Sequence, residues 1–163
     1  MLVLRCTQTL LARLKQANNL PTAESTTRLG DWYGNALKLG RRQYLLFISE
    51  RSRLPVVIPM RNARDLATTF PDAVCEVLAA VGVPDGDIAD ERARMSDVAF
   101  GRTRNRSLLG TMNDFAFMAQ GGSARWPEPD TPMELMRFLA QTPILPLKGA
   151  RPIDLTRAAF RGE

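Results

Sequence analysis

The sequence predicts one α+β domain: a small, mainly antiparallel sheet, made of one strand followed by a three-stranded meander, packed with about five helices. Three observations lead to this prediction. Hydrophobic residues alternate with polar ones between residues 32 and 59, as in strands, and recur every three or four positions elsewhere, as in helices. The 163 residues, 45% of them hydrophobic, are enough to bury a core. No repeat or linker divides the chain, so residues 1–163 are expected to form one domain.

The N-terminal part begins with a hydrophobic run from Leu2 to Cys6, which predicts a strand. Three leucines with helical spacing follow, and they predict a short helix over residues 7–15 with Thr7 as its N-cap. Small polar residues dominate 21–31, so this segment is expected to be a surface loop.

The next segment predicts a meander. Residues 32–39 and 43–49 flank the pair Gly40-Arg41, which predicts a type II′ turn because glycine readily adopts the positive φ of its first central position. Residues 54–58 add a third strand whose prolines cannot donate to the ladder, so it is expected at the sheet edge. One face should carry Tyr33, Asn35, Leu37, Tyr44, Leu46 and Ile48, and the other Trp32, Ala36, Leu45 and Phe47. Both faces are hydrophobic, so both should be covered.

Helical spacing returns after the meander. It predicts a helix over 63–69, a break or restart at Phe70-Pro71, and a second helix over 73–81. A weaker, charged helix is expected over 87–95, and residues 98–100 should be a short extended segment able to join the sheet.

The C-terminal part combines a loop, a helix and a tail. Residues 121–132 predict a loop, and 132–140 predict a helix. The proline-rich tail over 142–163 is expected to pack on the domain and to be helical only over 153–160.

The segment from Gly101 to Gln120 joins a basic loop to a hydrophobic helix. Residues with helical spacing predict the face of this helix that packs on the core: Leu108, Met112, Phe115 and Ala119. Either Asn105 or Ser107 is expected to be the N-cap, because each side chain can accept a backbone N–H of the first turn.

A second face of the same helix carries groups suited to contact with a partner. The same spacing predicts that it consists of Arg106, Gly110, Asn113 and Phe117. A glycine inside a helix costs about 1 kcal/mol relative to alanine. Gly110 therefore indicates a place where another group comes close to the backbone.

Arg102, Arg104 and Arg106 crowd the N-terminus of this helix, where the helix dipole already places about half a positive charge. A bound anion would make this arrangement favourable, because free N–H groups and guanidinium groups together bind phosphate or carboxylate. Alternatively, these arginines form ion pairs with the acidic residues just upstream: Asp85, Asp87, Asp90, Glu91 and Asp97. Solvated charges without a role are the third interpretation.

Composition excludes several classes of function. Without histidine, neither a Ser-His nor a Cys-His nucleophile can be built, and no phosphate-binding glycine motif is present, so no cofactor is predicted. Cys6 and Cys75 lie far apart in hydrophobic surroundings, which predicts two buried free thiols and no metal site. The N-terminus lacks a signal peptide and no membrane span is present, so a cytoplasmic protein is expected.

Several motifs resemble a family of small bacterial proteins known as a domain of unknown function. They are Leu4-Arg5-Cys6-Thr7, Trp32-Tyr33-Gly34-Asn35, Arg41-Arg42 before Tyr44-Leu45-Leu46-Phe47, and the run from Asn105 to Asp114. The resemblance extends from the first strand to about Phe117. It implies a shared small α+β domain and a bacterial origin, and it implies no activity.

Two functions of different classes follow from these observations. The first is a non-catalytic binding module for an anionic ligand, a nucleic acid or an acidic protein surface, consistent with a net charge of +5. Its predicted ligand-binding residues are Arg102, Arg104, Asn105, Arg106, Gly110, Asn113, Arg41 and Arg42. The alternative is an enzyme acting on a phosphorylated or nucleic-acid substrate, held by Arg106 and Asn113, with Asp114 as acid or base.

Overall fold

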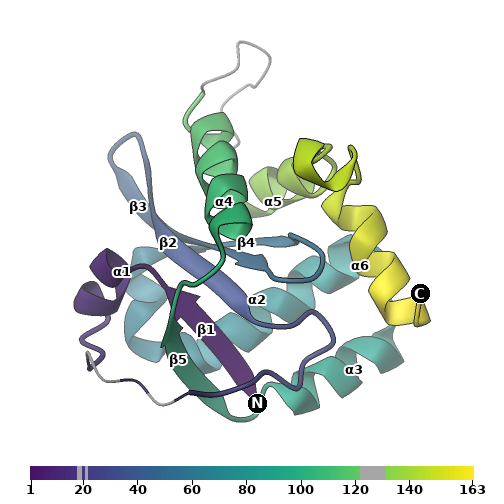
Figure 1. Ribbon diagram of the computed structural model, residues 1–163, viewed down its shortest axis with the longest axis horizontal. Helices are drawn as coiled ribbons and strands as arrows, with labels where there is room; N and C mark the ends of the chain where they lie inside the picture. The colour runs from purple at the N-terminus through teal and green to yellow at the C-terminus, as the bar shows by residue number, and fades with distance from the viewer. Residues whose placement is uncertain (18–19, 21, 122–130) are drawn as a thin grey trace.

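The computed structural model describes residues 1–17, 20, 22–121 and 131–163. Within these ranges the chain forms a five-stranded mixed sheet in the order β4-β3-β2-β1-β5 (Figure 1). The strands are β1 (Leu2–Cys6), β2 (Trp32–Leu39), β3 (Arg42–Ser49), β4 (Pro55–Pro59) and β5 (Val98–Arg102). The α+β class and the β2-β3-β4 meander are confirmed. The mainly antiparallel sheet is wrong, because β1 lies parallel to both of its neighbours, β2 and β5.

The parallel arrangement of β1 follows from the length of its connections. The chain leaves β1 through the short helix α1 (Gln8–Arg13), capped by Thr7 as predicted, and returns to β2 only at residue 32. A parallel pair needs a crossover of about a dozen residues or more, and this connection provides it. The end of the connection is not the expected surface loop, because Thr27, Leu29 and Asp31 are buried.

The hairpin matches its prediction closely. Leu39 pairs with Arg42 across the two-residue turn, and Gly40 has a φ of 58°, as the first central position of a type II′ turn requires. Tyr33 pairs with Ile48, so the predicted assignment of side chains to the two faces is also confirmed. β4 lies at the sheet edge, where its prolines leave the ladder intact.

One face of the sheet is covered by α2 (Leu66–Ala80), which follows the 3₁₀ helix η1 (Met60–Asp65). Phe70 packs edge-on against Trp32 and Phe47, with ring centroids 5.3 and 4.8 Å apart. The predicted break at Pro71 is wrong, because Pro71 lies inside a continuous helix. Proline removes one backbone hydrogen bond there, and the burial of Phe70 and Pro71 offsets that loss.

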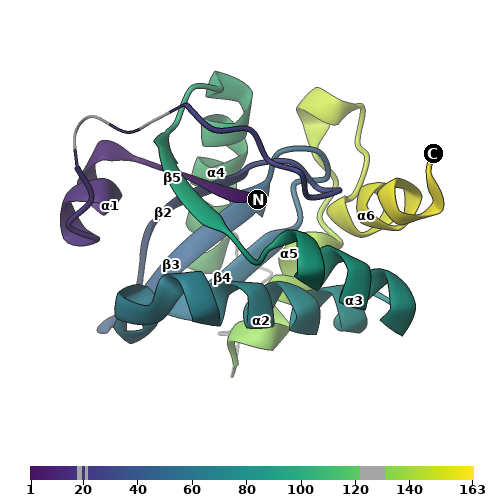
Figure 2. The same ribbon diagram turned by 90° about the horizontal axis from the view of Figure 1, so that it is seen from below.

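The opposite face is covered by α4 (Arg106–Ala119), which packs on β2 and β3; Figure 2 shows α4 and α2 on opposite sides of the sheet. The four predicted core residues of this helix are buried. The charged helix α3 (Asp85–Arg94) leads from α2 to β5, which joins the sheet as expected.

The C-terminal helices lie beside β4 and α2. They are α5 (Pro132–Ala140), the 3₁₀ helix η2 (Leu145–Leu147) and α6 (Pro152–Arg161). The helix predicted over 132–140 is confirmed, whereas most of the loop predicted over 121–132 lies outside the described residues. Both cysteines are free; Cys6 is buried as predicted, but Cys75 is only half-buried because it lies at the edge of α2's packed face.

Candidate functional site

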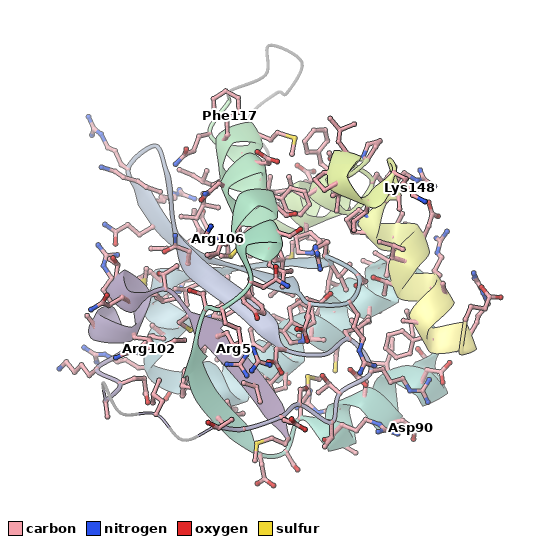
Figure 3. All side chains as sticks on the ribbon, in the orientation of Figure 1. Arg5, Asp90, Arg102, Arg106, Phe117 and Lys148 are labelled. Carbon is pink, nitrogen blue, oxygen red and sulfur yellow. The ribbon has the colours of Figure 1, made fainter. Side chains whose placement is uncertain are left out.

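The three clustered arginines lie where β5 passes into α4. Arg102 is the last residue of β5, Arg104 lies in the connection, and Arg106 is the first residue of α4. All three are exposed. Figure 3 shows Arg102 and Arg106 at the two ends of this connection, with Arg5 on the sheet below.

The start of α4 is capped by its own sequence. The Asn105 side chain accepts a hydrogen bond from the Leu108 amide at 3.2 Å, so of the two predicted caps Asn105 is confirmed. The amides of Arg106 and Ser107 belong to the first turn, where helix geometry supplies no acceptor. Two N–H groups at the positive end of the helix dipole therefore remain for another partner.

Arg5 is buried in the middle of the sheet beneath this connection, with 7% of its surface exposed. Its Nε donates to the Asp31 carboxylate, which is also buried, and its Nη1 donates to the Arg102 carbonyl at 3.3 Å. Gly101, the register partner of Arg5 on β5, makes room for the guanidinium, because a Cβ there would lie 2.9 Å from Nη1. The connection between β5 and α4 is thus held from below by a buried cation.

Arg104 reaches the same carboxylate from outside. Its Nη2 lies 3.7 Å from Asp31 Oδ2, although 59% of its side chain is exposed. Asp31 was absent from the acidic partners that the sequence suggested. One of those suggested, Asp87, pairs instead with Arg28 at 3.3 Å.

Tyr33, the register partner of Arg5 on β2, is fully buried on the same face. Its hydroxyl makes no hydrogen bond of good geometry with a described residue, although the Arg104 guanidinium lies close enough to interact with it. Burial raises the pKa of this phenol above its ordinary value of 10.0, and the Arg104 guanidinium lowers it by less. The hydroxyl is therefore a protonated donor at neutral pH.

Arg53, which is buried, and Glu50, which is half-buried, complete the group. Arg53 donates from Nη1 to the Glu50 carbonyl, while its Nε lacks a partner among the described residues. Burial lowers the pKa of the Arg53 guanidinium, an effect that Glu50 and Tyr33 partly offset. The Glu50 carboxylate accepts from the Asp31 amide at 3.3 Å.

We call these six residues the Arg5 cluster: Arg5, Asp31, Tyr33, Glu50, Arg53 and Arg104. The cluster contains three guanidinium groups and two carboxylates, so it carries an excess positive charge, part of which lies on the exposed Arg104. Buried charges are stable only when they are paired and hydrogen-bonded. A negatively charged group bound at the start of α4 would supply the missing charge.

The remaining predicted residues lie away from this cluster. Gly110 and Asn113 are exposed on the outer face of α4, in line with Arg106 and with Phe117, which is 60% exposed. A Cβ on Gly110 would have nothing within 4 Å, so no described group uses the bare backbone.

The hairpin tip lies at the far end of α4, where Gln120 donates to the Lys38 carbonyl at 3.0 Å. The 14 residues of α4 span about 20 Å. Arg41 and Arg42 are thus separated from the three clustered arginines, and they line a hollow of about 580 Å³ with the start of α5.

Sequence reasoning missed five of the six residues of the Arg5 cluster: Arg5, Asp31, Tyr33, Glu50 and Arg53. The available signal was Arg5 itself, the one charged residue in the otherwise hydrophobic strand LVLRC. A buried arginine requires an anionic partner, but nothing local identifies Asp31 as that partner.

The family model for a domain of unknown function, DUF6933, matches residues 3–155, and the chain therefore belongs to this family. No curated protein and no solved structure matches the chain significantly. Among the described helices, none combines the length and hydrophobicity needed to cross a membrane.

Proposed function

We propose that this member of the family is a cytoplasmic, non-catalytic binding module that receives a phosphate group where β5 passes into α4. The Arg5 cluster carries the proposal. It holds three guanidinium groups and two carboxylates at that connection, and within it the Tyr33 hydroxyl makes no hydrogen bond of good geometry with a described residue.

The groups that would contact the phosphate come from a short stretch of chain. The exposed Arg104 and Arg106 side chains offer guanidinium donors, and the amides of Arg106 and Ser107 offer N–H groups at the positive end of α4. Because Arg104 also approaches Asp31, it would link the bound anion to the buried charges. Arg5 would act only through Arg104 and Asp31, as a positioning residue.

The shape of this surface favours binding over catalysis. Three well-formed hollows on the molecule are lined by residues outside the Arg5 cluster and outside 102–106. Asp114, the candidate acid or base, is exposed on α4. A reaction at phosphate benefits from a site that excludes water, whereas a phosphate on an extended partner can bind to an open basic surface.

The proposal can be tested by thermal unfolding in phosphate and in chloride at equal ionic strength. Phosphate should raise the melting temperature of the wild type, because a ligand that binds only the folded state stabilises it. The shift should become much smaller in Arg104→Gln and Arg106→Gln. The control, Arg64→Gln, removes another exposed arginine, from η1, and should keep the full shift.

A short single-stranded oligonucleotide distinguishes a nucleic-acid partner from a free phosphate. If the partner is nucleic acid, affinity should fall steeply with salt, and Arg106→Gln should reduce the slope of log K against log salt by about one. Equal phosphate shifts in all four proteins would contradict the proposal and leave the Arg5 cluster with a structural role alone.

A further inference from the structure

A second group of arginines surrounds a hollow on the opposite side of the molecule from β5. The hollow has a volume of about 550 Å³ and lies between the end of α2, the last turn of α5 and the first half of α6. Figure 1 shows these two C-terminal helices side by side. The hollow is lined by Arg137, Arg151, Arg157 and Gln141, together with Ala80, Val81 and Ile153.

These arginines have far more donors than the hollow has acceptors. Arg157 donates from Nε to the Val81 carbonyl at 2.8 Å. Arg151 donates from Nε and Nη2 to the Asp154 carboxylate at 2.7 and 3.1 Å. Arg137 makes no ion pair or hydrogen bond with any described side chain. Since each guanidinium carries five N–H donors, most of them remain available to a ligand.

The local charge is also unbalanced. Asp154 is the one carboxylate paired with these three guanidinium groups among the described residues. Its pKa is lowered, first by the hydrogen bond from Arg151 and to a smaller extent by Arg157 and Arg161. The carboxylate therefore stays ionised and accounts for a single negative charge. The hollow retains an excess of positive charge.

Part of this charge has a structural explanation. Cations are favourable at the C-terminal ends of helices, and Arg157 caps the carbonyl of Val81 just after α2. Arg137 lies in the last turn of α5. Arg151, however, lies at the N-terminus of α6, where a positive charge is unfavourable and where no side chain caps the helix. Stabilisation of helix ends therefore does not explain the presence of all three arginines.

We infer that this hollow binds a small molecule carrying two or more linked phosphate groups. Four of its seven lining residues are arginine or glutamine, whereas pockets for uncharged ligands are lined mostly by hydrophobic side chains. Guanidinium groups match phosphate oxygens in geometry and charge. A volume of about 550 Å³ leaves room for more than one phosphate. The inference does not depend on the phosphate site at the start of α4.

Calorimetric titration with inorganic pyrophosphate, at constant ionic strength, tests this inference. Arg137→Gln is the informative variant because the arginine makes no ion pair or hydrogen bond with a described side chain. Without ligand, the melting temperature of this variant should therefore equal that of the wild type. Its dissociation constant for pyrophosphate should rise about tenfold, the loss of one charge-assisted contact worth about 1.4 kcal/mol. Arg64→Gln, an exposed arginine elsewhere, should bind as the wild type does.

The same titration in an Arg104→Gln background separates this site from the one proposed above. Pyrophosphate binding that persists in this background and is weakened by adding Arg137→Gln would support the hollow as an independent site. Binding that is lost with Arg104→Gln alone, or that is equal with and without Arg137, would overturn the inference. An absence of binding to the wild type would do so as well.

Discussion

Trp32 and Tyr33, neighbours on β2, point to opposite faces of the sheet and meet opposite chemistry there. Trp32 points toward α2 and packs against Phe70, whereas Tyr33, the next residue, lies on the other face beside Arg5. Trp32 lies among hydrophobic rings, whereas Tyr33 lies beside the charged side chains of the Arg5 cluster, on a face that α4 otherwise covers with hydrophobic residues. One strand thus stabilises the fold through Trp32 on one side and, through Tyr33 on the other, contributes to a group of charged residues that a hydrophobic core does not require.

Burial affects the free energy of folding with opposite sign in these two environments. Burying hydrophobic rings is favourable in proportion to the area removed from water. Burying ions requires that each lost contact with water be replaced, and the gain rarely exceeds the cost. The packing around Phe70 therefore stabilises the fold, whereas the Arg5 cluster costs stability that the proposed phosphate site would explain. Four predictions test this contrast, from the largest expected effect to the smallest.

Phe70→Ala should cause the largest loss of stability. The side chain is fully buried and contacts two further rings, so its removal leaves a cavity and breaks both edge-on contacts. We expect the free energy of unfolding to fall by about 4 kcal/mol, measured by urea denaturation. Phe117→Ala, which removes a ring that is 60% exposed, should change it by less than about 0.5 kcal/mol. Similar losses in both variants would contradict the contrast between the faces.

Asp31→Asn should cause the second-largest loss. It removes the charge that Arg5 and Arg104 share and leaves the buried Arg5 without an anionic partner. Breaking a buried pair in this way costs about 3 kcal/mol. Asp72→Asn breaks an exposed pair with Arg92 and should have little effect on urea denaturation. A loss below about 1 kcal/mol for Asp31→Asn would mean that water reaches Arg5.

These two faces also show what the sequence could and could not predict. The alternation of side chains, the Gly40 turn and the α4 stripe are local patterns, so the meander and its packed faces followed from them directly. The direction of β1 depends on pairing with residues far along the chain. So does the partner of Arg5, because Asp31 lies 26 positions away. Crowded arginines indicated the start of α4, but the buried half of the site has no local pattern.

The third prediction concerns pH and the hydrophobic face, on which Cys6 lies. Burial raises the pKa of its thiol from 9.0 to about 12. The thiol ionises near pH 9 in the unfolded chain and only near pH 12 in the folded one, so its contribution to stability is complete below pH 9 and is lost as the pH rises toward 12. At pH 10 the loss should be about 1.4 kcal/mol.

Urea denaturation at pH 8 and pH 10 measures this loss. Cys6→Ala should lack this part of the pH dependence, whatever its stability at pH 8. Cys75→Ala, which changes the half-buried thiol on α2, should retain it. Burial also raises the pKa of the Tyr33 phenol, but this contribution is common to all three proteins and cancels in the comparison. An identical pH dependence in all three proteins would show that Cys6 is not shielded from water.

The smallest change in stability is expected at the Arg5 cluster, and it is a gain where the other three predictions expect losses. Tyr33→Phe removes a buried hydroxyl that makes no hydrogen bond of good geometry with a described residue. An unsatisfied buried polar group costs about 1 kcal/mol or more, so in chloride buffer the variant should be more stable than the wild type by about that amount. If the hydroxyl serves the proposed phosphate site, the stabilisation by phosphate should shrink in the same variant. A more stable protein that responds less to phosphate would show that Tyr33 is kept for binding at the expense of stability. A loss of stability in chloride would instead assign the hydroxyl a structural bond to Arg104 in solution, and Tyr33 would then belong with Phe70 among the residues that support the fold.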